Sequence, residues 1–324
     1  QFVTRRQAGA ALLTAMLTVA LVASMASAAL WQQWRSVEVE TAQRARSQSL
    51  WVLTGALDWA RLILREDRRA NAIEDHLGEP WAVPLEEARL STFLAVDKNS
   101  SPDEADSAAQ VFLSGNITDL QSRMNVFNLV DKQGQVSTVW LRAFGKLFEQ
   151  LGLPPSELPV LAENLRFARD NTAATTWASK APLMPQRVGQ LRWLGLSSRS
   201  LALLADYITL LPESTAVNLN TASATVLYAC IPALDMAQAQ RLVSSRQAAH
   251  FRNFEDVNKL VPGIASELKT EDHGFSSSFF EIQGRLRLQQ TVVEERSLVQ
   301  RKGMDMKTLW RDRGAQPPAT SPLQ

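Results

Sequence analysis

Residues 5–30 of the chain read RRQAGAALLTAMLTVALVASMASAAL, two arginines followed by an almost wholly apolar segment. No Asp, Glu, Lys or Arg occurs between Arg6 and Arg35, a run of 28 residues. A helix of about 20 apolar residues crosses the hydrocarbon core of a bilayer, so this run is long enough to span it. Arg5 and Arg6 favour a cytoplasmic N-terminus. No second apolar run of that length occurs, so we expect the remainder of the chain on the far side of the membrane.

Three interpretations of this segment compete. A secretory signal peptide would combine the basic start with Ala26-Ser27-Ala28 as a cleavage site, and a plain single-span anchor would need only the apolar run. The third interpretation depends on Gly9, because a short basic leader that ends in Gly at the membrane edge resembles the cleavage site of prepilins. That resemblance implies cleavage after Gly9 on the cytoplasmic side and a mature, N-methylated chain that begins at Ala10.

The residues that follow indicate that the helix continues. Ala10–Leu77 contains no Pro and a single Gly, Gly55. Its second half carries an amphipathic stripe with apolar residues every three or four positions: Leu50, Leu53, Leu57, Ala60 and Leu64. A helix of about 60 residues, or about 90 Å, apolar first and amphipathic later, is typical of pilins, whereas a signal peptide is normally followed by a break. Gly78-Glu79-Pro80 is the expected stop.

The composition of the whole chain is that of an ordinary globular protein. Its 324 residues carry 34 Lys and Arg against 33 Asp and Glu, and 45% are hydrophobic. This balance excludes wholesale disorder and argues against nonspecific nucleic-acid binding through bulk charge. The single cysteine, Cys230, excludes an intramolecular disulfide framework and fits a buried core thiol. No phosphate loop, G-x-S-x-G or H-E-x-x-H signature is present, so we expect a protein that is not an enzyme.

Beyond the long helix the periodicity changes twice. Weak alternation in Leu85–Val96 and short runs at Val111–Leu113 and Asn116–Asp119 predict strands. Helical patterns then dominate from Thr138 to about Leu268, at residues 140–151, 158–169, 201–211, 221–230, 236–246 and 254–260. Strand patterns return at 280–288, 292–299 and 304–310. This order predicts an α+β, pilin-like fold, in which a long N-terminal transmembrane helix packs on an antiparallel sheet and a large all-helical domain is inserted.

The same patterns give the expected domain boundaries. They are 1–9 for a prepilin leader, 10–33 for the transmembrane part of the helix, 34–134 for its second half and the first strands, 135–275 for the inserted helical domain, 276–313 for the terminal strands and 314–324 for a flexible tail. Within the inserted domain, residues 217–262 resemble a helix-hairpin-helix module.

Short segments carry a resemblance to one family over nearly the whole chain. They are GAALLT at 9–14, QSLW at 48–51, ITDLQSRMNVFNL at 117–129, VNLNTA at 217–222, FFE at 279–281 and VEERS at 293–297. In this order they resemble protein K of type II secretion systems, the large minor pseudopilin. The matching polar positions are Asp119, Arg123, Asn125, Asn128, Asn218, Asn220 and Thr221.

The resemblance implies a role as well as a fold. Such proteins sit with the I-type and J-type minor pseudopilins at the tip of a periplasmic pseudopilus, with a single pass through the cell inner membrane. They support initiation of the filament that drives folded proteins through the outer-membrane secretin. Prepilin peptidase is the implied processing partner, and nucleic acid is not an expected partner.

Thr14 bears on the tip position. Counted from Ala10 it is the fifth mature residue, where major pilins usually have a Glu that pairs with the N-terminal amine of a neighbour. A carboxylate in the membrane is tolerated only when it is paired. A subunit with no neighbour above it has no such amine to meet, so Thr14 fits a tip subunit, although simple drift would also give a Thr.

Calcium is implied by the resemblance, yet its ligands are poorly represented here. After Asp170 and Asn171 the next acidic residue is Asp206, where relatives carry an acidic cluster, and calcium needs six to eight oxygens. Residues 97–103 resemble the start of an EF-hand loop, but Pro102 stands where Gly is needed. We therefore expect no cofactor, with Asp170 and Asn171 as the remaining metal candidates.

The helix-hairpin-helix resemblance supports an alternative function, a membrane-anchored periplasmic DNA receptor. Such hairpins use glycines so that backbone N–H groups approach phosphate, whereas the turn here, residues 231–235, reads IPALD. We expect this part to be a packing module. A further alternative is a minor pilin of another type IV filament.

Overall fold

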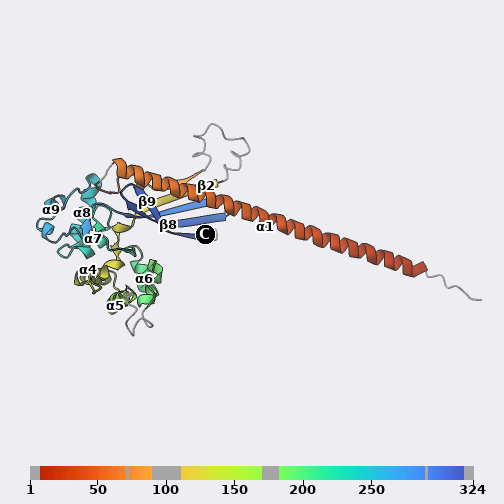
Figure 1. Cartoon of the computed structure of the whole chain (residues 1–324), viewed down its shortest axis with the longest axis horizontal. Helices are drawn as coiled ribbons and strands as arrows, with labels where there is room; N and C mark the ends of the chain where they lie inside the picture. Colours follow the sequence, from red (N-terminus) through yellow and green to blue (C-terminus); the bar gives the residue numbers. More distant parts are fainter. Residues whose placement is uncertain (1–7, 71–72, 90–110, 170–181, 289–290, 317–324) are drawn as a thin grey trace, which may run out of the picture. The chain divides into compact units, whose positions relative to one another are not determined.

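The computed structural model describes residues 8–70, 73–89, 111–169, 182–288 and 291–316. The chain divides into two compact units, Gln1–Thr54 and Gly55–Gln324. One helix, α1 (Ala8–Ala70), belongs to both units and has no break along its 63 residues (Figure 1). This confirms the predicted long helix.

The first unit is helix alone. Its apolar side chains are exposed from Leu12 to Leu30, and α1 is the one helix in the described ranges that is long and apolar enough to cross a membrane. The hydroxyls within the run each donate to a backbone carbonyl three or four residues earlier: Thr14, Thr18, Ser24 and Ser27. These bonds satisfy the hydroxyls inside the helix, as a lipid environment requires.

The end of α1 differs from the prediction. The helix ends at Ala70, before the expected stop at Gly78-Glu79-Pro80. The reason is tertiary, because Asp75 donates its backbone N–H to Phe275 O (2.7 Å) and its carboxylate binds Arg301, and both contacts draw this segment away from the helix axis.

In the second unit, the predicted stripe on α1 covers one face of a sheet. Leu57, Ala60 and Leu64 are buried in a cluster with Trp81, Phe280, Ile282, Val299 and Met306, which we call the pilin core. Apolar residues three and four apart share one face of a helix, which is why these three meet the sheet together. Of the other two stripe residues, Leu53 is buried and Leu50 is half-buried.

The sheet has five antiparallel strands in the order β1-β2-β7-β8-β9. Their bounds are β1 Leu85–Arg89, β2 Val111–Asp119, β7 Phe279–Leu288, β8 Thr291–Lys302 and β9 Asp305–Gln316. The two short runs expected around Gly115 are one strand, because Gly115 pairs with Gly284 of β7 inside the ladder. Strand β9 takes in 314–316, which were expected to belong to the tail. The alternating residues Leu90–Val96 lie outside the described residues.

Neighbouring strands β2 and β7 are separated in sequence by the whole helical domain. Successive residues of a strand point to opposite faces, so Phe280 enters the pilin core while Phe279 packs with Leu120, Leu211 and Leu298 on the other side. The dipeptide at the start of β7 thus contributes to both faces of the sheet.

The helices gather at one end of the sheet (Figure 1). They are α4 Thr138–Gln150, α5 Glu157–Arg169, α6 Ser198–Leu204, α7 Ala224–Cys230, α8 Met236–Ala248 and α9 Phe254–Leu260, with short 3-10 turns between them. They share one hydrophobic cluster of 35 buried residues among those described, which we call the helical core. These elements confirm the α+β fold with an inserted helical domain.

Two details of this domain differ from the prediction. The expected helix 201–211 ends at Leu204, and Ile208–Thr209 forms a short strand, β4, parallel to β3 (Met124–Asn125). Met124, Val126, Leu129 and Val130, which precede the predicted domain boundary at residue 135, also belong to the helical core.

Candidate functional site

The chain leaves the sheet at Asp119 and re-enters it at Phe279, and a buried polar network lies at this crossing. We call it the joint and define it by Asp75, Asp119, Asn218, Thr221, Ser277 and Arg301, all of which are buried. Three of the seven family-like motif residues, Asp119, Asn218 and Thr221, meet here. The structure thereby brings together residues that are about a hundred positions apart in the sequence.

Asp119 is the centre of the joint. Its Oδ2 accepts from Ser277 Oγ (2.6 Å), Thr221 Oγ1 (2.5 Å) and Asn218 Nδ2 (3.1 Å), while its Oδ1 accepts from the backbone N–H of Gln121 (2.7 Å). Burial raises the pKa of Asp119 to about 6, and the hydrogen bonds from Ser277, Thr221 and Gln121 oppose that rise. A carboxylate with four donors can remain in the interior without a cation of its own.

Asp75 and Arg301 form the charged half of the joint. Arg301 Nη2 lies 2.5 Å from Asp75 Oδ1 and donates to Ser277 O (2.7 Å). Asp75 Oδ2 also accepts from the backbone N–H of Ser277 (2.7 Å). Since the side chains of Asp75 and Arg301 are each only 2% exposed, removal of either partner would leave a buried charge unpaired.

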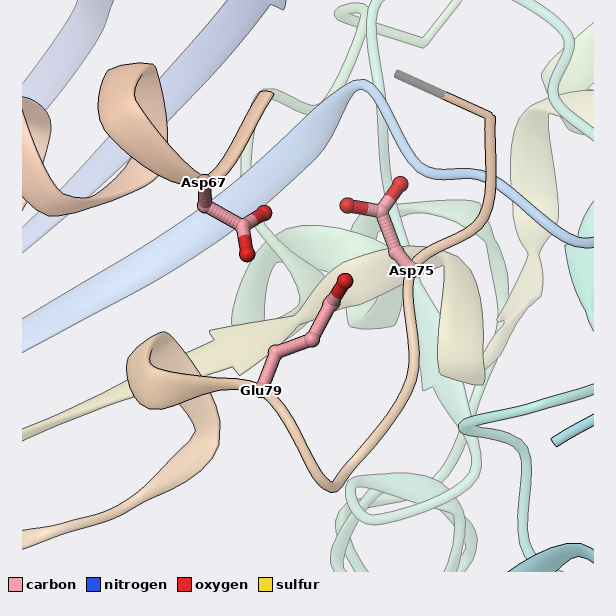
Figure 2. A group of neighbouring side chains, drawn as sticks. All are labelled: Asp67, Asp75 and Glu79. Carbon is pink, nitrogen blue, oxygen red and sulfur yellow. The ribbon is translucent and has the colours of Figure 1, made fainter. Parts of the chain in front are cut away.

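Three carboxylates converge beside Arg301 (Figure 2): Asp67 from the end of α1, Asp75 from the following loop, and Glu79 from just before the 3-10 turn Pro80–Ala82. One oxygen from each lies within 4.8 Å of the others. A divalent cation would have to share this space with the Arg301 guanidinium, which is 3.5 Å from Asp67 Oδ2. Glu79 Oε2 already accepts from Trp81 Nε1 (2.7 Å) and the backbone N–H of His76 (3.0 Å). The cluster therefore fits an ion-pair network better than a calcium site.

The crowding of acids has an electrostatic consequence at Asp67. Burial raises the pKa of Asp67 to about 7, the charges of Glu79 and Asp75 raise it further, and Arg301 opposes them. Asp67 therefore exchanges a proton near neutral pH, and its protonated form lowers the negative charge around Arg301.

The other motif residues hold neighbouring segments rather than the joint. Asn125 donates to Glu213 O (2.8 Å), and Asn128 donates to Thr215 O (2.8 Å) and accepts from Thr215 N (3.1 Å). Asn220 makes the same two-way amide bond with the backbone of Phe251, at 2.8 Å each way. Arg123 differs, because it is half-buried and its guanidinium donates to Ala205 O (3.4 Å). Three asparagines thus act as local clamps, and Arg123 lies apart from them.

The helix-hairpin-helix part is closed by side chains of the protein itself. Lys146 Nζ, from α4, donates to the carbonyls of Ile231 (3.1 Å), Leu234 (3.3 Å) and Pro232 (3.4 Å) in the turn between α7 and α8. It also lies 4.2 Å from the ring centroid of Tyr228. The turn without glycine is therefore held by an ammonium group from another helix.

A second turn follows α9 and does contain a glycine, Gly263, with φ +86°. Pro262-Gly263 is the turn signal in the sequence that marks it. The backbone N–H of Gly263 (3.0 Å) and that of Ala265 (3.4 Å) both donate to Asn258 Oδ1. A phosphate would have to displace this amide to use the same donors.

Cys230 is buried, as predicted, in the helical core. Burial raises the pKa of its thiol to about 12, so the thiol stays protonated at neutral pH. Its carbonyl oxygen lies 3.3 Å from His273 Nε2.

The remaining predicted site residues lie away from the joint. Gly9 and Ala10 fall in the first turns of α1, and Thr14 donates its hydroxyl to Ala11 O (3.0 Å). The metal candidates Asp170 and Asn171 and the EF-hand-like loop at 97–103 lie outside the described residues.

Several joint residues were missed from the sequence, above all Asp75, Ser277 and Arg301. One signal was available for Arg301, because it has the same parity in β8 as the buried Val299 and Ser297 and so lies on the covered face of the sheet. A charged residue at such a position requires a buried partner. The partner itself, Asp75, lies in an irregular loop and had no comparable signal.

A long helix with an apolar first part that is long enough to cross a membrane, an antiparallel sheet and a helical domain inserted between adjacent strands together define a pilin-like fold. Comparison with known proteins is more specific. Two models of the family described as "Type II secretion system (T2SS), protein K" match residues 122–213 and 217–276. By these matches and the relatives below, the chain is similar to protein K and is a minor pseudopilin of a type II secretion system.

The curated relatives agree over nearly their full length. Type II secretion system protein K of Pseudomonas aeruginosa is 26% identical over 331 residues, which cover 95% of this chain and 90% of the relative. The protein of the same name from Klebsiella pneumoniae is 26% identical over 329 residues, covering 92% and 94%. Among solved structures, a chain of the GspK-GspI-GspJ complex from the enterotoxigenic Escherichia coli type 2 secretion system matches with a TM-score of 0.63 at 18% identity, over 84% of this chain and 98% of that one. This last match supports the fold.

Proposed function

We propose that this minor pseudopilin acts at the tip of the pseudopilus, where it supports filament initiation and the export of folded proteins across the outer membrane. The observation that carries the proposal is the joint. It fixes a bulky helical domain to one end of the sheet through buried hydrogen bonds and the Asp75–Arg301 pair. A rigid domain at that end would take up the space that a further subunit needs, which suits the last position of a filament.

Thr14 supports the same position. The Thr14 hydroxyl donates to Ala11 O inside the helix. Thr14 therefore adds no charge to the membrane and does not need to pair with the N-terminal amine of a neighbour. A Glu at this position would need such a neighbour. The proposal therefore assigns Thr14 to a subunit above which no other subunit docks.

The proposed partners are the I-type and J-type minor pseudopilins. The solved relative was crystallised in a complex with proteins of these two types, and this chain shares its fold. Prepilin peptidase, which would cut after Gly9, is the proposed processing partner. Contact with the secretin and with secreted proteins would be indirect, and nucleic acid is not a proposed partner.

The proposed location is the cell inner membrane, with a single pass and the domain after α1 in the periplasm. The apolar part of α1 supports the pass, and Arg5 and Arg6 support a cytoplasmic N-terminus. The domain boundaries proposed from the sequence place residues 10–33 in the membrane.

Mass spectrometry of the mature N-terminus tests the processing. We expect a chain that starts at a methylated Ala10 in cells with prepilin peptidase, and an uncut leader in a Gly9→Val variant. A mature chain that starts at Ala29 would contradict the pilin-like anchor and support a secreted protein cut after Ala26-Ser27-Ala28.

Immunogold labelling of overproduced pseudopili tests the position. We expect label at one end of each filament and, in cells that lack this chain, few filaments and little export. Label along the whole filament would contradict the tip assignment while leaving family membership intact.

A gel-shift assay at low salt tests the DNA-receptor alternative, for which the occupied donors of Gly263 and Ala265 offer no support.

A further inference from the structure

Two tryptophans stand where the apolar part of α1 ends. Trp31 follows directly after Leu30, Trp34 follows three residues later, and Arg35 is the first charged residue after Arg6. Trp31 is 61% exposed and Trp34 is 63% exposed, although large aromatic side chains are normally well covered in a folded protein. Both lie in the first unit of the chain, where the described residues are helix alone.

The position of this pair along the helix matches the thickness of a membrane. Ala10 to Leu30 would extend about 31 Å at 1.5 Å per residue, against about 30 Å for the hydrocarbon core of a bilayer. If the helix begins at one boundary near Ala10, Trp31 falls at the other boundary and Trp34 lies one turn beyond it. Tryptophan is enriched at this depth because its ring is apolar while its N–H still needs a polar partner.

The neighbouring residues suit the same depth. Arg35 lies four positions after Trp31, and its guanidinium carbon is 5.6 Å from the Trp31 ring centroid. An arginine in this place offers donors to phosphate oxygens while its stem lies along apolar surface. Below the pair, Ser24 and Ser27 donate their hydroxyls to Leu21 O and Ala23 O, so no side-chain donor of the run competes for lipid.

We propose that Trp31, Trp34 and Arg35 form an interfacial anchor that binds the headgroup layer of a phospholipid bilayer and fixes the depth of α1. The anchor rests on the proposed single pass and adds its exact upper boundary. A subunit that leaves the membrane to enter a filament must first withdraw these two rings from the interface. The anchor therefore resists extraction on the side toward which the filament grows.

Trp51 provides an internal comparison. It is 77% exposed on the same helix and in the same unit, but it follows Trp34 by 17 residues, about 26 Å along the axis. The interval carries several charged residues, among them Arg35, Glu38 and Glu40. Exposure alone therefore does not define the anchor, and the proposal assigns lipid contact to Trp31 and Trp34 and none to Trp51.

Fluorescence quenching by lipid tests this assignment in the full chain. The protein is reconstituted into phosphatidylcholine vesicles whose acyl chains carry bromine either near the glycerol or near the methyl end. Quenching is compared for the wild type, the Trp31→Phe/Trp34→Phe double variant and the control Trp51→Phe. We expect bromine near the glycerol to quench the wild type, the double substitution to reduce that quenching about twofold or more, and Trp51→Phe to leave it unchanged.

Each other outcome overturns the anchor. Equal quenching of the wild type and the double variant, or stronger quenching by bromine near the methyl end, would place the two rings elsewhere. No quenching in protein that has entered the vesicles would mean that protein, such as a second helix, covers the pair. Failure of the wild type to enter vesicles at all would instead overturn the single pass, and helicity by circular dichroism shows that the variants remain folded.

Discussion

The pilin core and the helical core differ in size and in the charged groups that lie beside them. Among the described residues, the pilin core contains eight buried hydrophobic residues, contributed by α1, Trp81 and the sheet, whereas the helical core contains 35. The buried Asp75–Arg301 ion pair and Asp67 lie next to the pilin core, which is the smaller of the two. Burial of apolar surface is the main favourable term in folding, so the small core has little margin against a misplaced charge.

The two regions therefore depend on different interactions for their stability. The helical domain has enough buried apolar surface to hold its own shape, and the pilin part depends on α1 and on the charge balance around Arg301. The joint lies between them and uses hydrogen bonds more than apolar contact. Perturbations of the pilin core, the ion pair and the joint should therefore give graded effects that differ between the two regions.

The largest effect is expected from Leu57→Asp. Leu57 is 3% exposed in the pilin core, and an unpaired carboxylate there costs about 4 kcal/mol or more. We expect amide hydrogen exchange in the detergent-solubilised full chain to show loss of protection in β7 and β8, with α4 and α5 still protected. Leu62→Asp, on the same helix at 40% exposure, is the matched control and should change little. Simultaneous loss in both regions would show one cooperative unit and break the comparison.

The next effect is expected from Arg301→Ala. Removal of one partner from a buried ion pair typically costs about 3–5 kcal/mol, because the other charge is left without compensation. Arg285, whose side chain is 51% exposed and lies 3.6 Å from Glu294, is the control, and Arg285→Ala should cost less than about 1 kcal/mol. Chemical denaturation of the full chain measures both. Equal losses would show that Arg301 is no more important than a surface charge.

A smaller effect is expected from Thr221→Val, which removes one of the donors to Asp119. Loss of a hydrogen bond to a buried charged group costs about 1–3 kcal/mol. Because Thr221 belongs to the helical domain and Asp119 to the sheet, protection should fall around both. Ser266→Ala, which removes an exposed hydroxyl bonded to Gly263 O, should stay within about 0.5 kcal/mol. An effect confined to the helical domain would show that the joint does not couple the two regions.

The smallest effect is a dependence on pH. The pKa of Asp67 is raised from 3.8 to about 7 in the folded chain, so between these values the native state binds more protons than the unfolded state. Stability from this group therefore falls as pH rises through that window and is recovered as pH is lowered. We expect the melting temperature of Asp67→Asn to respond less to a rise in pH from about 5 to about 7 than that of the wild type. Identical profiles would contradict the raised pKa.

Local patterns predicted the fold where local forces decide it. The stripe Leu57, Ala60 and Leu64 and the helix Phe254–Leu260 followed from periodicity and from punctuation by polar or turn residues. The helix predicted for residues 201–211 is wrong beyond Leu204, because Ile208 and Thr209 pair with Met124 and Asn125. These partners are too far away in the sequence for a local pattern to reveal them. The early end of α1 has the same kind of cause, since Phe275 binds the backbone N–H of Asp75 and Arg301 binds its carboxylate.

Only some residues of the joint could be identified from the sequence. The resemblance marked Asp119, Asn218 and Thr221, but it gave no account of why a carboxylate, an amide and a hydroxyl belong together. These three residues come together because the chain returns to the joint at Ser277. A single sequence does not show which distant residues lie close in space. Arg301 was detectable by strand parity, whereas Asp75 was not.

The insertion of the helical domain between β2 and β7 also sets an order of events in folding. Asp119 and Phe280 are paired across the sheet, and a chain that had to close the open segment 120–279 would lose entropy that grows with the logarithm of its length. A folded helical domain shortens this closure, because it pairs Gly274 with Asn218, whose side chain binds Asp119. We therefore expect β2 and β7 to pair quickly only after the inserted domain has formed, so that this domain serves as the template on which the sheet is assembled.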